Sequence, residues 1–400
     1  MLRSFALTAP PPDPTNAVAD LPAGARLGQK FFFDTRFSGP LGPASEAGGG
    51  SLGHPGERSK VACVSCHDPA SGGTDHRSHP DATSLAAGWT GRNAATVLNA
   101  AYSPSWQFWD GRKDSLWSQA LGPPESPVEH NGSRLRYAHV IYDLYQADYE
   151  AIFGPLPALW DVARFPAEGK PGDRAFDTMA ASDRQAVNRV YVNFGKAIAA
   201  YERRLVSTSF MPSPFDRLLE GEAGALGPAA IRGAKLFVGR AACNECHNGA
   251  ALSDFRFHNV GVPQIGQNVP PLDRGRMDGI AGVKADAFNR AGPFSDASEG
   301  QVLAALQAQA ADLGAFKTPT LRNVTRTAPY MHNGVYATLW DVLQHYRFGG
   351  ATGRFVGTKD VSVVPLPLSD HDLEDLLAFL GALEDGPPLD PDLVRAPVLP

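Results

Sequence analysis

Cys63-Val-Ser-Cys66-His67 and its counterpart Cys243-Asn-Glu-Cys246-His247 share the pattern C-x-x-C-H. This pattern is typical of c-type haem attachment, in which two thiols bond to the porphyrin edge and the adjacent imidazole binds the iron. Two cysteines three residues apart lie on one side of a tight helical turn, so both can reach one porphyrin. A four-cysteine zinc site or a pair of disulfides is the alternative, because C-x-x-C alone is ambiguous. The two motifs use all four cysteines of the chain, which favours two covalently bound haems.

Composition indicates an ordinary globular protein. A length of 400 residues suggests two or three domains. A hydrophobic content of 43% and a charged content of 20% are normal for such chains. The net charge of −6 and the absence of a basic run argue against a nucleic-acid partner. No stretch reaches the roughly 18 apolar residues that a membrane-spanning helix needs.

The N-terminal residues 1–8 are too short for a signal peptide and lead directly into three prolines. Covalent haem attachment normally takes place outside the bacterial cytoplasm. We therefore expect a mature, exported periplasmic protein from which the signal has been removed. Residues 9–15 and 387–400 are proline-rich and are expected to run as extended tails on the surface.

The hydrophobic pattern predicts a mainly α-helical fold with little strand. Apolar residues keep the helical period over five turns between Val187 and Leu205, and residues 138–153 show a similar face. Further helices are expected over 27–33, from the capping residue Thr338 and from the capping residue Ser369. A helical turn over 116–121 is expected to end at Gly122-Pro123-Pro124. Residues 39–60, 68–92 and 254–300 are predicted loops, and 212–228 is a predicted linker.

The chain also contains a weak internal repeat. Ile231 to Phe237 precedes the second haem motif much as Leu27 to Phe33 precedes the first. We therefore predict two related, cytochrome-c-like haem domains, residues 1–215 and residues 216–400.

Beyond these motifs, the chain resembles the bacterial di-haem cytochrome c peroxidase family, which includes the methylamine-utilisation enzyme MauG. The resemblance extends over roughly residues 25–385. It is carried by Leu27-Gly28 to Phe33-Asp34, the two haem motifs, Gly91-Arg92-Asn93 to Thr96, Gln107 to Arg112, Pro127-Val128-Glu129, Phe316 to Asn323, Thr327 to His332, and His345-Tyr346.

The resemblance implies that the N-terminal haem is the peroxide site and that the C-terminal haem handles electrons. It also implies a calcium ion between the haems, held by an asparagine side chain and by threonine and proline carbonyls. The matching positions are Asn93, Thr327 and Pro329. Oxygen ligands of this kind suit calcium.

Three further residues gain roles from the resemblance. Trp109 matches the tryptophan between the two haems, where an oxidisable indole can shorten an electron hop. Outside this context a tryptophan is usually a core aromatic. Glu129 matches the acid on the open side of the peroxidatic haem, although a lone glutamate is usually a solvated surface charge. A partly desolvated carboxylate can take a proton from peroxide and return it to the leaving oxygen. Gln119 matches a polar residue of the same pocket.

Two departures concern the axial ligands. In the reductively activated peroxidases a histidine caps the peroxidatic iron, and Ala87 stands at that position here. His76 and His79 lie nearby and could substitute, but we expect both to be exposed. Those enzymes also place a methionine fourteen residues after the histidine that matches His332. The residue at that position here is Tyr346, and MauG carries tyrosine there.

A tyrosine on a helical stripe is usually a core residue with a bonded hydroxyl. His345 is adjacent, but neighbouring helical residues point about 100° apart, so only one of the two can face the iron. The apolar stripe that Tyr346 shares with Leu339, Val342 and Leu343 selects Tyr346. One residue differs from MauG: Ala241 stands where MauG carries a tryptophan that oxidises its protein substrate.

The sequence therefore predicts a periplasmic di-haem peroxidase with MauG-like ligation. Hydrogen peroxide is expected to react at the His67 haem with Glu129 as the acid–base group. The oxidising equivalents, held as high-valent iron, are expected to be shared with the His247 haem through Trp109. The partner would be a small redox protein as electron donor. A MauG-like oxidase that modifies a partner protein is one alternative, and an electron carrier or redox sensor without catalysis is the other.

Overall fold

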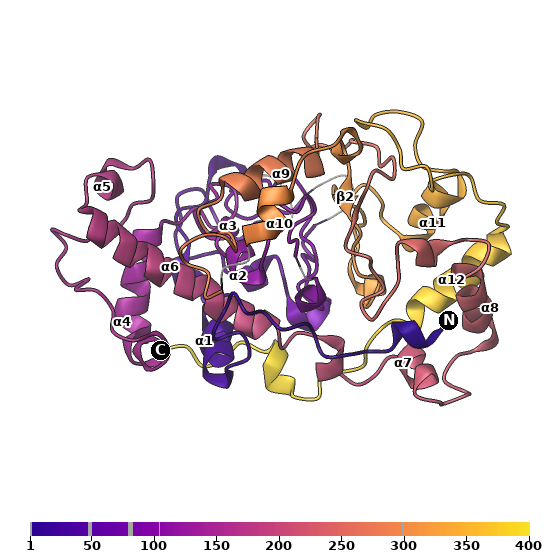
Figure 1. Ribbon diagram of the computed structural model, residues 1–400, viewed down its shortest axis with the longest axis horizontal. Coiled ribbons are helices and arrows are strands. Elements are labelled where there is room, and N and C mark those ends of the chain that lie inside the picture. Colours follow the sequence, from indigo (N-terminus) through magenta and orange to yellow (C-terminus); the bar gives the residue numbers. More distant parts are fainter. Residues whose placement is uncertain (1, 47–49, 79–82, 104, 298–299) are drawn as a thin grey trace.

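The computed structural model describes residues 2–46, 50–78, 83–103, 105–297 and 300–400, and their regular structure is mainly helical (Figure 1). The longer helices are α1 (Pro22–Phe33), α4 (Arg134–Phe153), α6 (Ala181–Glu202), α8 (Pro228–Phe237), α9 (Arg276–Ala285), α11 (Leu339–Arg347) and α12 (Asp370–Gly381). The shorter ones are α2 (Leu116–Gln119), α3 (Gly122–Glu125), α5 (Arg174–Asp177), α7 (Pro214–Leu219) and α10 (Gly300–Ala305). Strands β1 (Phe257–His258) and β2 (Phe316–Lys317) pair in antiparallel fashion. The predicted mainly α class is confirmed. Across these described ranges, no helix is long and apolar enough to cross a membrane.

In the N-terminal part, α1 crosses α6 where the two backbones come very close. A Cβ atom at Gly28 would lie 1.8 Å from the carbonyl oxygen of Ala197, so only glycine fits at this crossing. The apolar stripe of α6, which the sequence predicted, forms the centre of one hydrophobic core together with aromatic residues of α1, α2 and α4. This core includes Phe31, Trp117, Tyr137, Val190 and Phe194.

The C-terminal part repeats this arrangement with α8 and α12, which lie side by side in Figure 1. A Cβ atom at Gly233 of α8 would lie 1.9 Å from the carbonyl oxygen of Asp375. A second core surrounds this crossing and includes Phe215, Phe237, Leu373, Leu376 and Phe379. Each haem motif therefore follows a helix in which a glycine allows close packing against a longer helix.

The loops after the two haem motifs also follow the same backbone path. Non-glycine residues rarely adopt the left-handed conformation. Here such residues recur in the same order in both halves, each set ending in a left-handed glycine. The pairs are Asn99 (φ 63°) and Asn323 (φ 61°), Phe108 (φ 64°) and Met331 (φ 72°), and Gly111 (φ 68°) and Gly334 (φ 68°). The internal repeat is thus confirmed at the level of the backbone.

The two cores are nevertheless joined by segments that cross between them. Phe5 belongs to the C-terminal core, whereas Phe288 and Phe294 belong to the N-terminal one. The predicted division into residues 1–215 and 216–400 therefore stays a prediction about which segments carry each haem.

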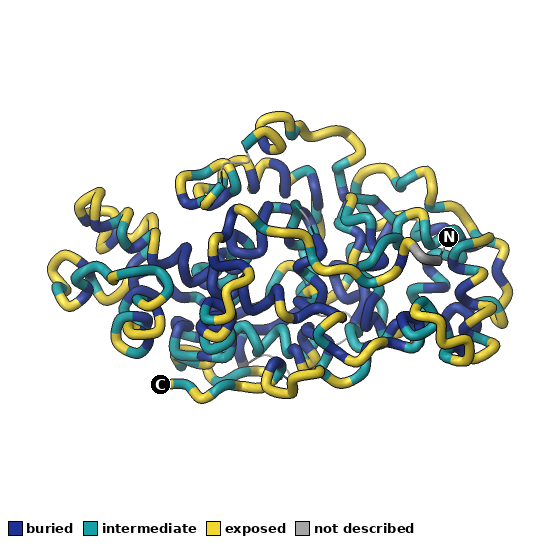
Figure 2. Tube along the Cα trace, turned by 60° about the horizontal axis from the view of Figure 1, so that its bottom comes forward, coloured by how far each residue is buried: buried dark blue, intermediate teal, exposed yellow. Residues whose placement is uncertain are grey.

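Both ends of the chain are held more firmly than the prediction of surface tails implied. The Trp117 indole donates a hydrogen bond of 2.9 Å to the hydroxyl of Thr15, which is fully buried. The C-terminal segment is mostly exposed (Figure 2), but Leu393 is buried and its carbonyl accepts a 2.7 Å bond from the Tyr201 hydroxyl. The N-terminus begins near α8 and α12, and the C-terminus ends beside α1 and α4 (Figure 1).

Three loop predictions were wrong. Gly122-Pro123-Pro124 opens α3 rather than closing a helix, because proline is well tolerated in a first helical turn. The predicted linker 212–228 contains α7, which buries Phe215 in the C-terminal core. The predicted loop 254–300 contains α9 and β1, held by contacts far away in the sequence. Residues 47–49, 79–82 and 298–299 of the predicted loops lie outside the described residues.

The glycine at the α1–α6 crossing provides a test of the fold. Gly28→Ala should lower the free energy of unfolding by about 1–3 kcal/mol, because the added methyl group overlaps the α6 backbone. Gly224→Ala is the control: no heavy atom lies within 4 Å of its would-be Cβ, and its effect should stay within about 0.5 kcal/mol. Denaturant midpoints measure both. Equal midpoints for the two variants would show that the helices do not cross as described.

Candidate functional site

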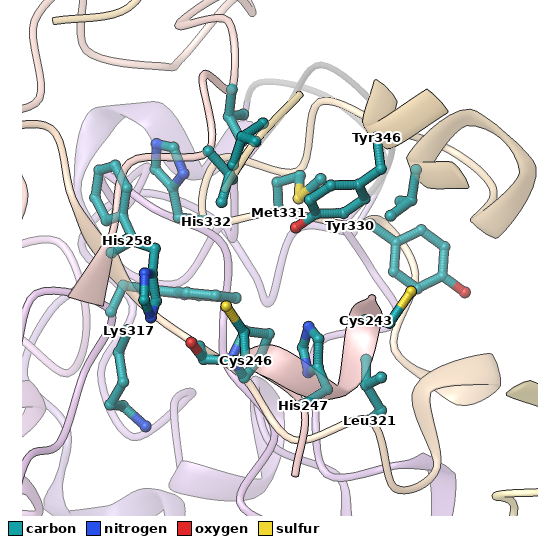
Figure 3. Close-up of a pocket in the computed structure, with 18 of the residues that line it drawn as sticks. Cys243, Cys246, His247, His258, Lys317, Leu321, Tyr330, Met331, His332 and Tyr346 are labelled. Carbon is teal, nitrogen blue, oxygen red and sulfur yellow. The ribbon is translucent and has the colours of Figure 1, made fainter. Parts of the chain in front are cut away.

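The second haem motif lines a large internal cavity of about 960 Å³ (Figure 3). Cys243 and Cys246 lie at the two ends of a short helical turn, Cys243–Glu245, and His247 follows it. The His247 ring donates through Nδ1 to the carbonyl of Leu252 at 3.0 Å, which leaves Nε2 free. Burial lowers the pKa of His247 and keeps the ring neutral, as a metal ligand must be.

Tyr346 reaches into the same cavity from α11. Figure 3 shows its hydroxyl directed toward the interior on the side opposite His247. Among the described residues, none forms a hydrogen bond with this hydroxyl. Burial, with a smaller contribution from the two nearby thiols, raises the pKa of Tyr346. A buried phenol that faces a cavity without a partner suits a ligand role.

His345 faces elsewhere, as the helical geometry predicted. Its Nδ1 meets the hydroxyl of Tyr336 at 2.8 Å and its Nε2 meets the carbonyl of Val260 at 2.9 Å. Both ring nitrogens are therefore engaged. The choice between the two adjacent residues falls on Tyr346.

This donor set fits a covalently bound haem. Two thiols, one imidazole and one phenol surround a single cavity at the upper end of the usual size range for ligand pockets. All four cysteines are free of disulfide bonds. In the described part of the chain, Cys246, Asp254 and His258 form the one group of three metal-ligating side chains, so no four-cysteine zinc site is assembled. His258 is already bonded to Asp254 at 3.1 Å and to Asp360 at 2.7 Å.

The first haem motif has the same local geometry. Cys63–Ser65 forms a short helical turn, and the His67 Nδ1 lies 3.4 Å from the carbonyl of Gly73. The Cys66 sulfur accepts a 3.3 Å bond from Arg77. Burial raises the pKa of both thiols, yet their side chains keep accessible surface. Both thiols and the imidazole are half-buried, and the motif repeats the local geometry of the second one, so it also suits a haem.

Glu129 lies beside this first motif. Burial raises the pKa of its carboxyl, against hydrogen bonding by Ser126 and the charge of Arg112. The charge of Glu129 also helps to raise the pKa of both motif thiols, although burial and other charged groups contribute more. The carboxyl therefore lies near both thiols. Tertiary structure thus converts a residue of ordinary surface type into a desolvated acid.

Ala87 is the immediate neighbour of Glu129. The Ala87 amide donates to the Glu129 carbonyl at 3.0 Å, and the methyl group is buried in a small cluster against which Cys66 packs. Alanine offers no donor atom to an iron. His76 is exposed as expected, with its ring against the Ser71 carbonyl, and His79 lies outside the described residues.

The internal repeat can also be followed from the helix caps. Ser115 caps α2 as Thr338 caps α11, and the same number of residues from each cap leads along the chain to Pro123 in the first half and Tyr346 in the second. α2 ends at Gln119 and Pro123 belongs to α3, whereas α11 continues to Arg347. Proline carries no ligand atom. In the same register Gln119 corresponds to Val342, which lines the second cavity. Gln119 is half-buried, and its register predicts that it lines the first haem site.

Asn93 and Trp109 are hydrogen-bonded to each other beside the second motif. The Trp109 indole donates to the Asn93 carbonyl at 2.9 Å, and both residues line the second cavity. The Asn93 amide nitrogen donates to the Pro329 carbonyl at 2.7 Å, whereas its Oδ1 is buried without a hydrogen-bond partner. Thr327 lines the cavity close by. The Asn93 Oδ1, which lacks a hydrogen-bond partner, and the nearby Pro329 carbonyl oxygen are ligands that suit a hard cation.

Two buried charged groups had no role in the sequence prediction. Burial raises the pKa of Glu202 to about 8, and its charge acts on Cys63. Burial lowers the pKa of Lys317 to about 8, and this residue lines the second cavity. The sequence pattern that could have identified Glu202 is a carboxylate at the end of the buried face of α6. Ala241 also lines the second cavity and is buried.

Comparisons with known proteins agree with this geometry. The sequence profile of the family described as di-haem cytochrome c peroxidase matches residues 22–224. Cytochrome-c peroxidase IdrP1 of Denitromonas iodatirespirans is 32% identical over 97% of this chain and 89% of the relative. Methylamine utilization protein MauG of Methylorubrum extorquens is 29% identical over 95% of this chain and 82% of the relative.

A solved structure shares the fold. The diheme peroxidase BthA from Burkholderia thailandensis matches with a TM-score of 0.64 at 23% identity, over 96% of this chain and 93% of that one. Together, the paired haem motifs, the shared architecture and the extent of the sequence matches lead to one conclusion. The chain belongs to the di-haem cytochrome c peroxidase family, and it is a peroxide-reducing oxidoreductase.

Proposed function

We propose that this protein is a periplasmic di-haem peroxidase that reduces hydrogen peroxide at its N-terminal haem. Cys63, Cys66 and His67 would hold that haem covalently. Cys243, Cys246 and His247 would hold the second one, with Tyr346 as its sixth ligand. The observation that carries the proposal is the half-buried Glu129 carboxyl beside the first motif, whose pKa desolvation raises, where neither Ala87 nor Pro123 offers an iron ligand.

The domain assignment follows from the same motifs. Residues 1–215 would form the peroxidatic domain and residues 216–400 the electron-transfer domain. The periplasmic location rests on the covalent haem attachment that the motifs imply. Haem supplies the redox chemistry when bound, and the chain supplies the axial ligands, proton transfer and the path between the sites.

Glu129 would be the acid–base group. Its carboxylate form takes a proton from one peroxide oxygen and returns it to the oxygen that leaves as water, so the residue is unchanged after the step. Desolvation raises the pKa of this carboxyl, which favours its acid form relative to that of a solvated glutamate. Gln119 would hydrogen-bond peroxide in the same pocket.

Trp109 would carry electrons between the two sites. Its indole is fixed by the bond to the Asn93 carbonyl, and the Lys317 amide donates to its carbonyl at 2.7 Å. A rigidly held indole keeps the distance to each site constant. Asn93, Thr327 and Pro329 would bind calcium beside it.

A second candidate is a MauG-like oxidase of a partner protein, favoured by the tyrosine that faces the second site and by the similarity to MauG. The buried Ala241 argues against it, because this alanine replaces the tryptophan that MauG uses. If the electron donor is a small redox protein, the overall reaction is that of a peroxidase. An electron carrier without catalysis does not explain the desolvated Glu129 carboxyl.

Stopped-flow spectroscopy of the fully ferric protein with peroxide, without reductant, tests the proposal. The parent should react at once, because Ala87 stands at the position of the capping histidine and, among the described residues, His76 is exposed. Glu129→Gln should react about 10²–10⁴-fold more slowly, since it keeps the size but loses the proton shuttle. The parent rate should fall as pH decreases through the raised pKa of Glu129, and the variant should lack this dependence.

Intact mass spectrometry supplies the control for that experiment, because both proteins must carry two covalent haems. Equal rates for the parent and Glu129→Gln would remove Glu129 from the mechanism. A ferric parent that is inert until reduced would contradict the open first site.

Replacement of Tyr346 tests the second axial ligand. An anionic phenolate stabilises oxidised iron better than a thioether does, so Tyr346→Met should raise the reduction potential of the second haem. Spectroelectrochemistry measures the potential, and the near-infrared spectrum should change with it. His345→Gln should leave the axial ligand in place. An unchanged potential in Tyr346→Met would show that the phenol is not a ligand.

Removal of calcium tests the site at Asn93. Metal analysis should find one calcium per chain. Chelation should lower stability by about 2.7 kcal/mol, if the calcium supplied is a hundredfold above its dissociation constant. Calcium should restore the melting temperature and magnesium should not, because magnesium demands a smaller octahedral site. A protein without calcium, or one indifferent to the chelator, would contradict the assignment.

A further inference from the structure

Tyr336 and His345 form a hydrogen-bonded phenol–imidazole pair beside the second haem site. The Tyr336 oxygen lies 2.8 Å from His345 Nδ1, and His345 Nε2 lies 2.9 Å from the carbonyl oxygen of Val260. A carbonyl only accepts hydrogen bonds, so Nε2 must carry the ring proton. Nδ1 therefore presents a lone pair, and the Tyr336 hydroxyl donates to it.

The pair is in contact with the proposed axial ligand. The His345 ring lies 5.3 Å from the Tyr346 ring and 5.4 Å from the Tyr336 ring, measured between centroids. The hydroxyl of Tyr346 faces the cavity of the second motif, as Figure 3 shows. The three side chains thus form a continuous series of rings from that cavity outward.

Tyr336 also lies close to the molecular surface. Its side chain is half-buried, and the next two residues, Ala337 and Thr338, are exposed. His345, in contrast, is buried, with 6% of its surface exposed. Tyr336, which is followed by two exposed residues, is therefore the point of the series from which we expect an external molecule to be reached, whereas the Tyr346 hydroxyl faces the cavity.

This geometry suits one-electron oxidation of the phenol. Loss of an electron makes a phenol strongly acidic, so the reaction needs an acceptor for the proton. Proton transfer is efficient when the acceptor lies within hydrogen-bond reach, about 2.6–3.2 Å. The Nδ1 lone pair meets this requirement without any movement of the chain.

We propose that Tyr336 is a redox-active tyrosine that relays electrons between the second haem site and an external one-electron donor. The inference rests on the proposed function, which supplies hydrogen peroxide as the oxidant. In the forward step the phenol gives one electron to the oxidised second site and its proton to His345 Nδ1, forming a neutral tyrosyl radical. In the return step an electron from the donor and the proton from His345 restore the phenol. Two such passages supply the two electrons that convert peroxide and two protons into two waters.

The relay makes Tyr336 the oxidisable residue beside the second site. Ala241 cannot have this role, because alanine is not oxidisable. It also indicates the class of partner. A donor would approach the surface next to Thr338 and deliver single electrons, as a small redox protein does.

Freeze-quench electron paramagnetic resonance of the two-haem protein tests the relay. The ferric protein is mixed with peroxide without a donor, in samples grown with ordinary and with ring-deuterated tyrosine. The parent should show an organic radical whose spectrum narrows on deuteration. Tyr336→Phe should lose this radical, and the control Tyr142→Phe, altered in the half-buried tyrosine of α4, should keep it.

His345→Gln keeps the phenol and removes the base, so it separates the relay from a merely structural bond. The radical should then form about 10²-fold more slowly, the low end of general-base contributions. A structural role for the bond would change stability and leave radical formation at the parent rate.

The remaining outcomes separate the two proposals. If the parent consumes peroxide but forms no tyrosyl radical, or if the radical survives in Tyr336→Phe and is lost in Tyr330→Phe, the relay is overturned and the peroxidase proposal stands. If the ferric parent shows no optical response to peroxide, the proposed function fails first, and the relay fails with it.

Discussion

The relation between the two haem sites depends on the hydrogen bonds of Asn93. Its backbone amide donates to the His332 carbonyl at 2.8 Å, and its carbonyl accepts from the Trp109 indole at 2.9 Å. Its side-chain nitrogen donates to the Pro329 carbonyl at 2.7 Å. One residue of the N-terminal half therefore fixes both the Trp109 ring and the loop that follows the second motif. The unpartnered Oδ1 carries the cost of a buried polar atom, which a bound cation would remove.

The two halves share a backbone but present different side chains at equivalent positions. The same spacing from a helix cap leads to Pro123 in one half and to Tyr346 in the other. Proline offers no side-chain donor atom, whereas tyrosine offers a phenol. In the first half Glu129 lies near the motif, and desolvation raises the pKa of its carboxyl. The internal repeat supplies two similar motifs, and a few substitutions give them different surroundings.

Long-range packing keeps this arrangement rigid. Gly28 and Gly233 allow two pairs of helices to approach at backbone distance, and an alanine would not fit at either point. The buried ion pair of Arg322 with Asp216 also binds the carbonyl of Phe5, which ties the N-terminal segment to the C-terminal core. Such constraints matter for electron transfer because the rate depends steeply on distance.

The sequence by itself determined everything that is local in the chain. Each C-x-x-C-H motif determines its own ligand geometry within five residues, and the period of α6 and the register of Tyr346 on α11 follow from helical repeat alone. Tertiary structure decided what depends on contacts between distant segments. The α7 and α9 helices form in stretches whose composition suggested loops, because packing outweighs weak local propensity. Burial of Glu129 beside the first motif, the bonds of Asn93, and the pairing of Tyr336 with His345 all arise from folding. No local pattern encodes these contacts, since each joins groups whose approach is fixed only when the whole chain has closed around its cofactor sites.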